Sequence, residues 1–155
     1  MKEETRTIAE KIKYYRKLRN MTTEELSIST GILPSMLRKY ESDVRFPKYE
    51  QIKSIANGLG MNVSAFLDLD VKTVGDAIAL LMLIKGNSNI KWTGKKDKNG
   101  KYIPSSISFS FEDDELNQSL SDYLAIEEGS DLEINVEDQK ARLLFNQTEL
   151  KKPGE

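Results

Sequence analysis

A single glycine inside residues 21–41, MTTEELSISTGILPSMLRKYE, constrains the fold more than any other feature of the sequence. Thr22 and Glu25 have the spacing of a capping box, in which each side chain bonds to the other residue's amide at a helix start. Gly31 predicts the end of that helix, because a left-handed residue without a β-carbon costs little free energy. Pro34 suits the first position of a following helix, where its missing N–H would have no intrahelical partner. The stretch therefore predicts two short helices joined by a tight turn.

The second of these helices is expected to have two different faces. Leu37 and Tyr40 fall on one side at helical spacing, whereas Ser35, Arg38 and Lys39 fall on the other. The first side can pack against other helices. The second side is polar and cationic, as expected either of a solvated surface or of a surface that meets an anion.

Residues Ile8 to Leu67 resemble the helix-turn-helix domain of the Cro/cI-type transcriptional regulators, also called the XRE or lambda-repressor-like family. Several anchors in the family's order and spacing make this resemblance more specific than one short motif. The anchors are Arg16, Leu26, Gly31, Glu41, Pro47 and the run LGMNVSAFL. The resemblance implies a bundle of five helices. Their expected bounds are Thr7–Arg19, Thr23–Thr30, Pro34–Ser42, Tyr49–Leu59 and Val63–Leu67.

The resemblance also implies which residues touch DNA. Arg38 is the strongest candidate for reading a base, because a guanidinium can donate two parallel hydrogen bonds to guanine. Arg16 and Glu41 match an internal ion pair that links the first helix to the end of the third. The residues expected to read bases are Ser35, Arg38 and Lys39, and those expected to contact phosphates are Thr23, Ser42, Arg45 and Lys48.

Four positions depart from the family pattern. Thr23 stands where relatives carry a glutamine, and its hydroxyl can still donate to a phosphate over a shorter reach. Ser27 replaces a small alanine. Leu33 occupies the position at which a serine or threonine normally caps the helix. Pro34 occupies a position at which relatives often read a base, but a proline cannot donate a hydrogen bond. We therefore expect only Ser35, Arg38 and Lys39 to read bases.

Composition narrows the chemistry. The 155 residues include neither cysteine nor histidine, so the sequence offers no disulfide framework and lacks the usual zinc ligands and catalytic bases. We therefore expect no metal, no cofactor and no enzymatic activity. The sequence contains no apolar run long enough to span a membrane, and its start MKEETRTIAEK lacks the apolar core of a signal peptide. These features predict a cytoplasmic protein.

Charge separates the two parts of the chain. Residues 1–67 contain 12 Lys and Arg against 8 Asp and Glu, whereas residues 68–155 contain 11 against 17. The basic part coincides with the helix-turn-helix resemblance. We therefore expect a DNA-binding domain over 1–69 and a second module over 70–155, and we expect residues 1–69 alone to fold as a monomer that binds DNA weakly.

The second part predicts a small α+β module, which matches no family that we recognise. Thr73 and Asp76 mark a helix start and Gly86 a stop, and the enclosed VGDAIALLMLIK is apolar on nearly all sides, so this helix should be buried. Asn99 and Gly100 predict a hairpin turn. One strand is expected after the turn, with an apolar face formed by Ile103, Ser105, Ile107, Phe109 and Phe111 and with Pro104 at an edge or a bulge. A helix from Asp113 to Ile126 and a last one within Glu137 to Leu150 should follow.

Three features of this module leave alternatives open. Trp92 is expected in the core against the apolar helix, and the alternative is the floor of a ligand pocket. The lysine-rich hairpin tip fits either a soluble tip that protects a sheet edge or a wing lying along DNA. The acidic stretch 112–138 fits either a solvated surface or an acidic surface that weakens non-specific DNA binding or docks a basic partner. The tip lysines are Lys95, Lys96, Lys98 and Lys101.

The expected function follows from the resemblance. It is sequence-specific binding of double-stranded DNA by a transcriptional regulator, a repressor that binds a palindromic operator as a homodimer through the helix Pro34–Ser42. The apolar helix and its hairpin are the expected dimer interface. The alternative is an antitoxin-like or other interaction module that regulates its own operon and binds a partner protein through the acidic second part.

Overall fold

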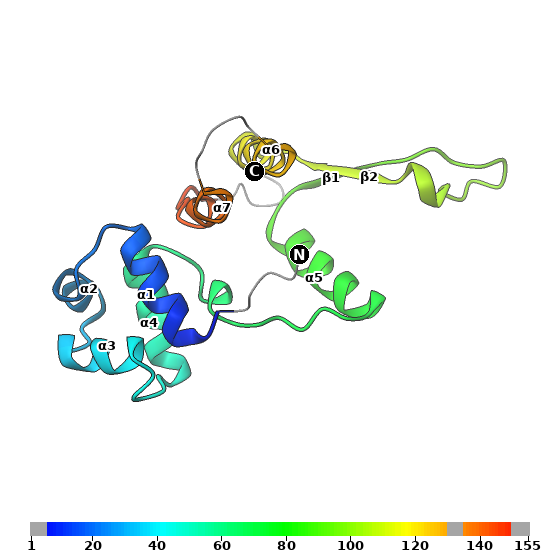
Figure 1. Cartoon of the computed structure of the whole chain (residues 1–155). Coiled ribbons are helices and arrows are strands. Elements are labelled where there is room, and N and C mark those ends of the chain that lie inside the picture. The colour runs from blue at the N-terminus through cyan, green and yellow to red at the C-terminus, as the bar shows by residue number, and fades with distance from the viewer. Residues whose placement is uncertain (1–5, 130–134, 150–155) are drawn as a thin grey trace. The chain divides into compact units, whose positions relative to one another are not determined.

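The computed structural model describes residues 6–129 and 135–149. These residues form two compact units, one of 6–69 with 135–147 and one of 70–129 with 148–149. The described residues contain seven α-helices, two short 3₁₀ turns and one two-stranded antiparallel sheet, which confirms the α+β class (Figure 1). No helix in these ranges is long and apolar enough to cross a membrane.

The first unit contains the expected bundle with a shortened last helix. Four helices are followed by a 3₁₀ turn at Val63–Ala65, where a longer helix to Leu67 was expected. The Asn62 side chain accepts a hydrogen bond from the Ser64 amide at 2.9 Å, which closes this turn at its start. The four helices are α1 (Ile8–Leu18), α2 (Thr23–Thr30), α3 (Pro34–Glu41) and α4 (Tyr49–Leu59).

The core of this unit lies between the four helices. Phe66 is fully buried, and its ring meets the ring of Tyr15 edge-on with centroids 5.4 Å apart. Burial of such large apolar side chains supplies most of the free energy that stabilises a small bundle. The other buried apolar residues of the helices include Ile12, Leu18, Leu26, Leu37, Tyr40, Ile52, Ile55 and Leu59.

A helix from the far end of the chain completes this unit. In α7 (Val136–Leu143), the Asp138 carboxylate accepts a hydrogen bond from the Tyr14 hydroxyl at 2.6 Å. Burial, and then this hydrogen bond, raise the pKa of Tyr14 above its ordinary value. Ala141 is buried in the same core, and the Phe145 ring packs edge-on against Tyr15 with centroids 6.4 Å apart. The contacts therefore group α7 with the first four helices, whereas the sequence suggested one module over 70–155.

This grouping bears on the prediction that residues 1–69 alone fold as a monomer. A chain that ends at Leu69 lacks the cover that Ala141 and Phe145 give to α1. The sequence pattern does not reveal this contact, because a short amphipathic helix does not specify which surface it will meet.

The second unit has the expected order of helix, hairpin and helix. Its first helix begins at the predicted capping box, since the Thr73 hydroxyl accepts from the Asp76 amide at 3.1 Å and the Asp76 carboxylate accepts from the Thr73 amide at 2.8 Å. In the sheet, Ile90 pairs with Phe111 and Thr93 with Ser108. The elements are α5 (Val74–Asn87), β1 (Ile90–Thr93), β2 (Ser108–Phe111) and α6 (Asp114–Glu128).

The strand expected from 103 to 111 is wrong in its first half. Pro104 begins a 3₁₀ turn, Pro104–Ser106, so regular pairing starts only at Ser108. The Ser106 hydroxyl accepts from the Lys95 amide at 2.8 Å and donates to the Ile103 carbonyl at 2.8 Å. The Ser106 side chain thus replaces a backbone hydrogen bond of the strand pairing, which the proline interrupts.

The second unit also lacks the burial that its sequence predicted. No residue of α5 is buried, and Met82 and Leu83 are 67% and 64% exposed. Trp92 is 41% exposed and packs on Phe109 across the sheet with ring centroids 5.4 Å apart, so its expected place in a core against the helix is wrong. In fact, none of the apolar side chains described between residues 70 and 129 is buried.

The α7 contact predicts a specific loss of stability. Phe145→Ala removes the ring that packs on Tyr15 and on the Arg19 guanidinium. We expect a loss of roughly 2 kcal/mol, less than for a fully buried phenylalanine because Phe145 is only half-buried. Amide hydrogen exchange of α1 in the full chain measures this loss. The exposed neighbour Leu144→Ala is the matched control and should cost less than about 0.5 kcal/mol; equal effects would contradict the packing.

Candidate nucleic-acid interface

The turn between α2 and α3 has the geometry that the sequence predicted. Gly31 adopts a left-handed conformation with φ of 71°, and its amide donates to the Ser27 carbonyl at 2.9 Å. The capping box at the start of α2 is also present, because Thr22 and Glu25 exchange hydrogen bonds between side chains and amides. The amide of Thr22 thereby lowers the pKa of the Glu25 carboxyl. These local bonds fix both ends of α2.

A glycine that sequence reasoning did not single out sets the distance between α2 and α4. A β-carbon at Gly58 would lie 2.6 Å from Cγ2 of Thr30 and 3.0 Å from Oγ of Ser29. The first of these distances is shorter than real β-carbon contacts, so a larger residue at this position would require Thr30 to shift. The signal available in the sequence was a glycine inside an otherwise regular helix.

A nearly buried ion pair fixes α3 on α1. Nε and one terminal nitrogen of Arg16 donate to the two carboxylate oxygens of Glu41 at 2.6 and 2.9 Å, and the other terminal nitrogen donates to the Met21 carbonyl at 2.8 Å. The side chains of the pair are 13% and 9% exposed. The expected pairing of Arg16 with Glu41 is therefore present, and it also holds the segment that precedes α2.

The face of α3 that looks away from the bundle carries the three expected base readers. Leu37 and Tyr40 are buried, whereas Ser35, Arg38 and Lys39 are exposed. The start of α3 has no side-chain cap at Leu33, and Pro34 stands at the beginning of the helix, as the sequence predicted. The helix thus offers a polar surface about two turns long.

Arg38 is not unpaired on this surface, because its guanidinium donates to the carboxylate of Glu24 on α2. Both side chains are more than half exposed, at 56% and 59%. An exposed pair of this kind contributes at most about 1 kcal/mol, whereas a bidentate contact with guanine is worth about 1 to 3 kcal/mol. A guanine can therefore displace Glu24, or bind while Glu24 still holds the other side of the guanidinium. Sequence reasoning missed Glu24, since only the fold brings residues 24 and 38 together.

The loop after α3 is tied back to the helix. The amides of Val44 and Arg45 donate to the Lys39 carbonyl at 3.0 and 3.1 Å, and Asp43 takes a left-handed conformation with φ of 57°. These bonds place the Arg45 side chain, which is exposed, directly after the end of the recognition surface. An anchored loop presents its cation at a smaller cost in conformational entropy than a free one.

The residues expected to contact phosphates come from several elements. Thr23 is the first residue of α2 and is half-buried, whereas Ser42, Arg45 and Lys48 are exposed. Ser42 ends α3 and donates its hydroxyl to the Arg38 carbonyl at 2.8 Å, and Lys48 immediately precedes α4. In the chain, one of the four positions thus precedes α3 and three follow its last turn.

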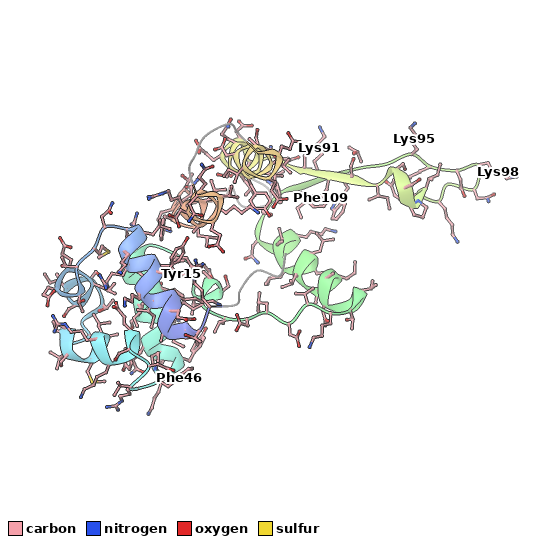
Figure 2. The ribbon with its side chains drawn as sticks, in the orientation of Figure 1. Tyr15, Phe46, Lys91, Lys95, Lys98 and Phe109 are labelled. Atoms are coloured by element: carbon pink, nitrogen blue, oxygen red, sulfur yellow. The ribbon has the colours of Figure 1, made fainter. Side chains whose placement is uncertain are left out.

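Exposed apolar side chains accompany these polar ones. Leu33 is 67% exposed, Val44 is 73% exposed and Phe46 is 67% exposed, and Figure 2 shows Phe46 at the outer edge of the helices. Apolar groups in this position can contact thymine methyl groups or sugars. Val44 and Phe46 were not among the residues expected at this surface, although apolar residues beside Arg45 and before Pro47 were a visible signal.

Among residues 6–129 and 135–149, no group of three or more carboxylates is placed to hold a metal ion.

The ion pair predicts how stability responds to loss of one charge. Glu41→Gln leaves the Arg16 guanidinium nearly buried without a counter-charge, so we expect the free energy of unfolding to fall by roughly 3 kcal/mol. Urea unfolding followed by helical circular dichroism measures this. Asp68→Asn is the control, because it breaks the Lys11–Asp68 pair whose carboxylate is 69% exposed and should cost less than about 1 kcal/mol. Comparable losses in the two variants would contradict the structural role of Glu41.

Comparison with known proteins agrees with the geometry of the first unit. Residues 9–70 match the family model described as "Helix-turn-helix domain". A solved structure entitled "SinR protein/SinI protein complex" is similar at 22% identity and a TM-score of 0.39, over 53% of this chain and 84% of that chain. None of the curated proteins matches. Residues 9–70 are therefore a helix-turn-helix domain, similar to those of XRE-type DNA-binding regulators.

Proposed function

We propose that this protein is a repressor that binds a palindromic operator as a homodimer, and that it acts by binding rather than by catalysis. The observation that carries the DNA-reading part of the proposal is the exposed polar face of α3 on a frame held by the Arg16–Glu41 pair. Rigid placement of the reading helix favours specific binding, because little ordering is then needed on contact.

The proposed division of labour follows from side-chain chemistry and position. Arg38 reads a guanine, and Ser35 and Lys39 read neighbouring base edges in the major groove. Arg45 and Lys48 contact phosphates without reading sequence, as do Thr23 and Ser42 through their hydroxyls. Repression needs only that the bound protein occupies its operator, so it requires no surface for activating the polymerase.

The uncovered apolar surface of the second unit supports the homodimer. A two-stranded sheet is marginal in water unless another layer covers it, yet both α5 and the sheet expose their apolar side chains. Ile90, Trp92, Phe109 and Phe111 lie on one face of the sheet, since they occupy alternate positions of paired strands. Exposed apolar side chains in this number are typical of a surface that another protein covers.

A second copy of this chain is the proposed occupant of that surface. One short recognition helix reads only a few base pairs, and helix-turn-helix domains reach useful specificity when a two-fold axis relates two half-sites. A symmetric dimer through α5 and the apolar sheet face would cover these side chains on both copies at once.

A second candidate is an antitoxin-like interaction module that regulates its own operon. The observation that favours it is the run 112–129, which contains seven Asp and Glu and no Lys or Arg. Such a surface would suit a basic partner protein. Stoichiometric co-purification of a basic protein from the native host, lost when carboxylates of α6 are neutralised, would favour this candidate.

Selection of bound sequences from random DNA tests the proposal directly. We expect a palindromic motif with half-sites about one helical turn apart. Arg38→Ala should remove the preference for one base and cost about 1 to 3 kcal/mol on the best site, whereas Lys48→Ala should weaken all sequences alike. An unchanged motif for Arg38→Ala would refute base reading by Arg38, and selection of no motif would refute sequence-specific binding. All affinities must be compared at one salt concentration, because phosphate contacts depend steeply on it.

A charge placed on α5 tests the dimer. Met82→Glu puts a carboxylate on the exposed apolar surface, and we expect it to raise the dimer dissociation constant at least tenfold in sedimentation, because burying an unpaired charge costs several kcal/mol. Ile28→Glu is the control, since Ile28 is 84% exposed on α2 in the other unit. A wild-type chain that sediments as a monomer, or a Met82→Glu dimer of unchanged affinity, would contradict this interface.

A further inference from the structure

The hairpin from 90 to 111, which we call the arm, is a cationic segment inside an acidic part of the chain. It contains five lysines and one aspartate, whereas residues 112–129 contain seven Asp and Glu and no Lys or Arg. Figure 2 shows Lys91, Lys95 and Lys98 along the arm. All five lysines are exposed. The positive charge is thus concentrated on one element.

The two faces of the arm differ in chemistry. Trp92 and Phe109 lie on the apolar sheet face already assigned to the dimer. The opposite face carries Lys91 together with hydroxyls, and the hydroxyls of Thr93 and Ser108 are 2.6 Å apart. Lysines and hydroxyls are side chains that contact nucleic-acid phosphates. If protein covers the apolar face, the polar face remains open to solvent.

The lysines of the tip keep their charge available. The Asp97 carboxylate is used within the turn, where Oδ1 accepts from the amides of Asn99 and Lys101 at 2.8 and 3.0 Å. The amide of Gly100 donates to the Asp97 carbonyl at 3.0 Å, which closes the same turn. Among the residues that the structure describes, none of the five arm lysines forms an ion pair with a carboxylate.

Protection of a sheet edge does not account for this cluster. Edge lysines prevent pairing with another strand, but the paired strands β1 and β2 end at Thr93 and begin again at Ser108. Four of the five lysines lie between these residues, where the only further pairing described is the single bridge between Lys96 and Tyr102. The tip thus concentrates like charges where only this one bridge pairs the two segments, despite the mutual repulsion of the charges.

We propose that the arm is a second DNA-binding element, whose tip and polar face bind phosphates of the duplex outside the base pairs read by α3. The inference rests on the proposed function, since it takes the polyanion to be the DNA that the first unit binds. Lysine is a point charge that follows a phosphate without base specificity, and a two-stranded ribbon is narrow enough to lie along a groove. The arm therefore contributes affinity and length of footprint, whereas α3 contributes sequence preference.

The test compares the full-length protein with two quadruple variants at the same four tip positions. In the first, Lys95→Gln, Lys96→Gln, Lys98→Gln and Lys101→Gln remove the charges. In the second, arginine replaces the same four lysines and keeps them. Binding is titrated over a salt series on a long duplex that holds the selected operator, on a long scrambled duplex, and on a short duplex that holds the operator alone.

We expect the glutamine variant to bind both long duplexes at least about tenfold more weakly at low salt, with a salt slope reduced by about 0.9 for each phosphate that the tip no longer neutralises. The arginine variant should retain the wild-type affinity and slope. On the short operator the glutamine and wild-type proteins should bind alike, and the selected motif should not change. Hydroxyl-radical footprints should lose the protection of flanking backbone in the glutamine variant only.

Two outcomes would overturn the inference. One is an unchanged affinity and salt slope of the glutamine variant on the long duplexes. The other is an unchanged DNA affinity combined with a shifted dimer dissociation constant in sedimentation, which would assign the lysines to an acidic protein surface such as α6 of a second copy. The scrambled duplex separates this inference from the proposed function, because phosphate binding by the arm is measurable there even if no operator motif is selected.

Discussion

The position of α3 in the helix-turn-helix unit depends on one nearly buried ion pair, Arg16 with Glu41. Arg16 donates to both oxygens of Glu41 and to the Met21 carbonyl, so one side chain joins α1, the entry to α2 and the end of α3. Desolvation makes such a pair a weak source of net stability, but breaking it is costly. Its main effect is therefore on geometry, because it restricts α3 to one orientation on the core.

Once α3 is held, the surface around it combines two kinds of interaction. Arg38 pairs with Glu24 in the protein alone, so its charge is partly balanced before any nucleic acid is present. The pair is exposed and therefore weak, which allows exchange of the carboxylate for a base edge or a phosphate. The bonds from the loop amides to Lys39 then place Arg45 beside the same surface. Local hydrogen bonds thus position the cationic side chains, and the Arg16–Glu41 pair positions α3.

The two units solve the problem of burial differently. The first unit buries its apolar side chains between its own helices and adds α7, whose Ala141 and Phe145 extend the core. The second unit leaves much of α5 and of one sheet face exposed, where Trp92 packs on an exposed Phe109. Since a hairpin and two helices of this size bury little core alone, the second unit exposes the apolar surface that the proposed dimer would cover.

Local elements of this protein can be predicted from the amino-acid sequence, but contacts between distant residues cannot. The capping boxes at Thr22 and Thr73, the left-handed Gly31 and the placement of Pro34 each follow from interactions within a few residues. Family resemblance added the pairing of Arg16 with Glu41. By contrast, the fold alone brought Glu24 to Arg38, placed α7 on α1 and left the apolar α5 without cover in the single chain. Hydrophobic patterning indicates that a helix must bury one face. The hydrophobic effect is non-directional, so the pattern does not specify which surface will cover that face.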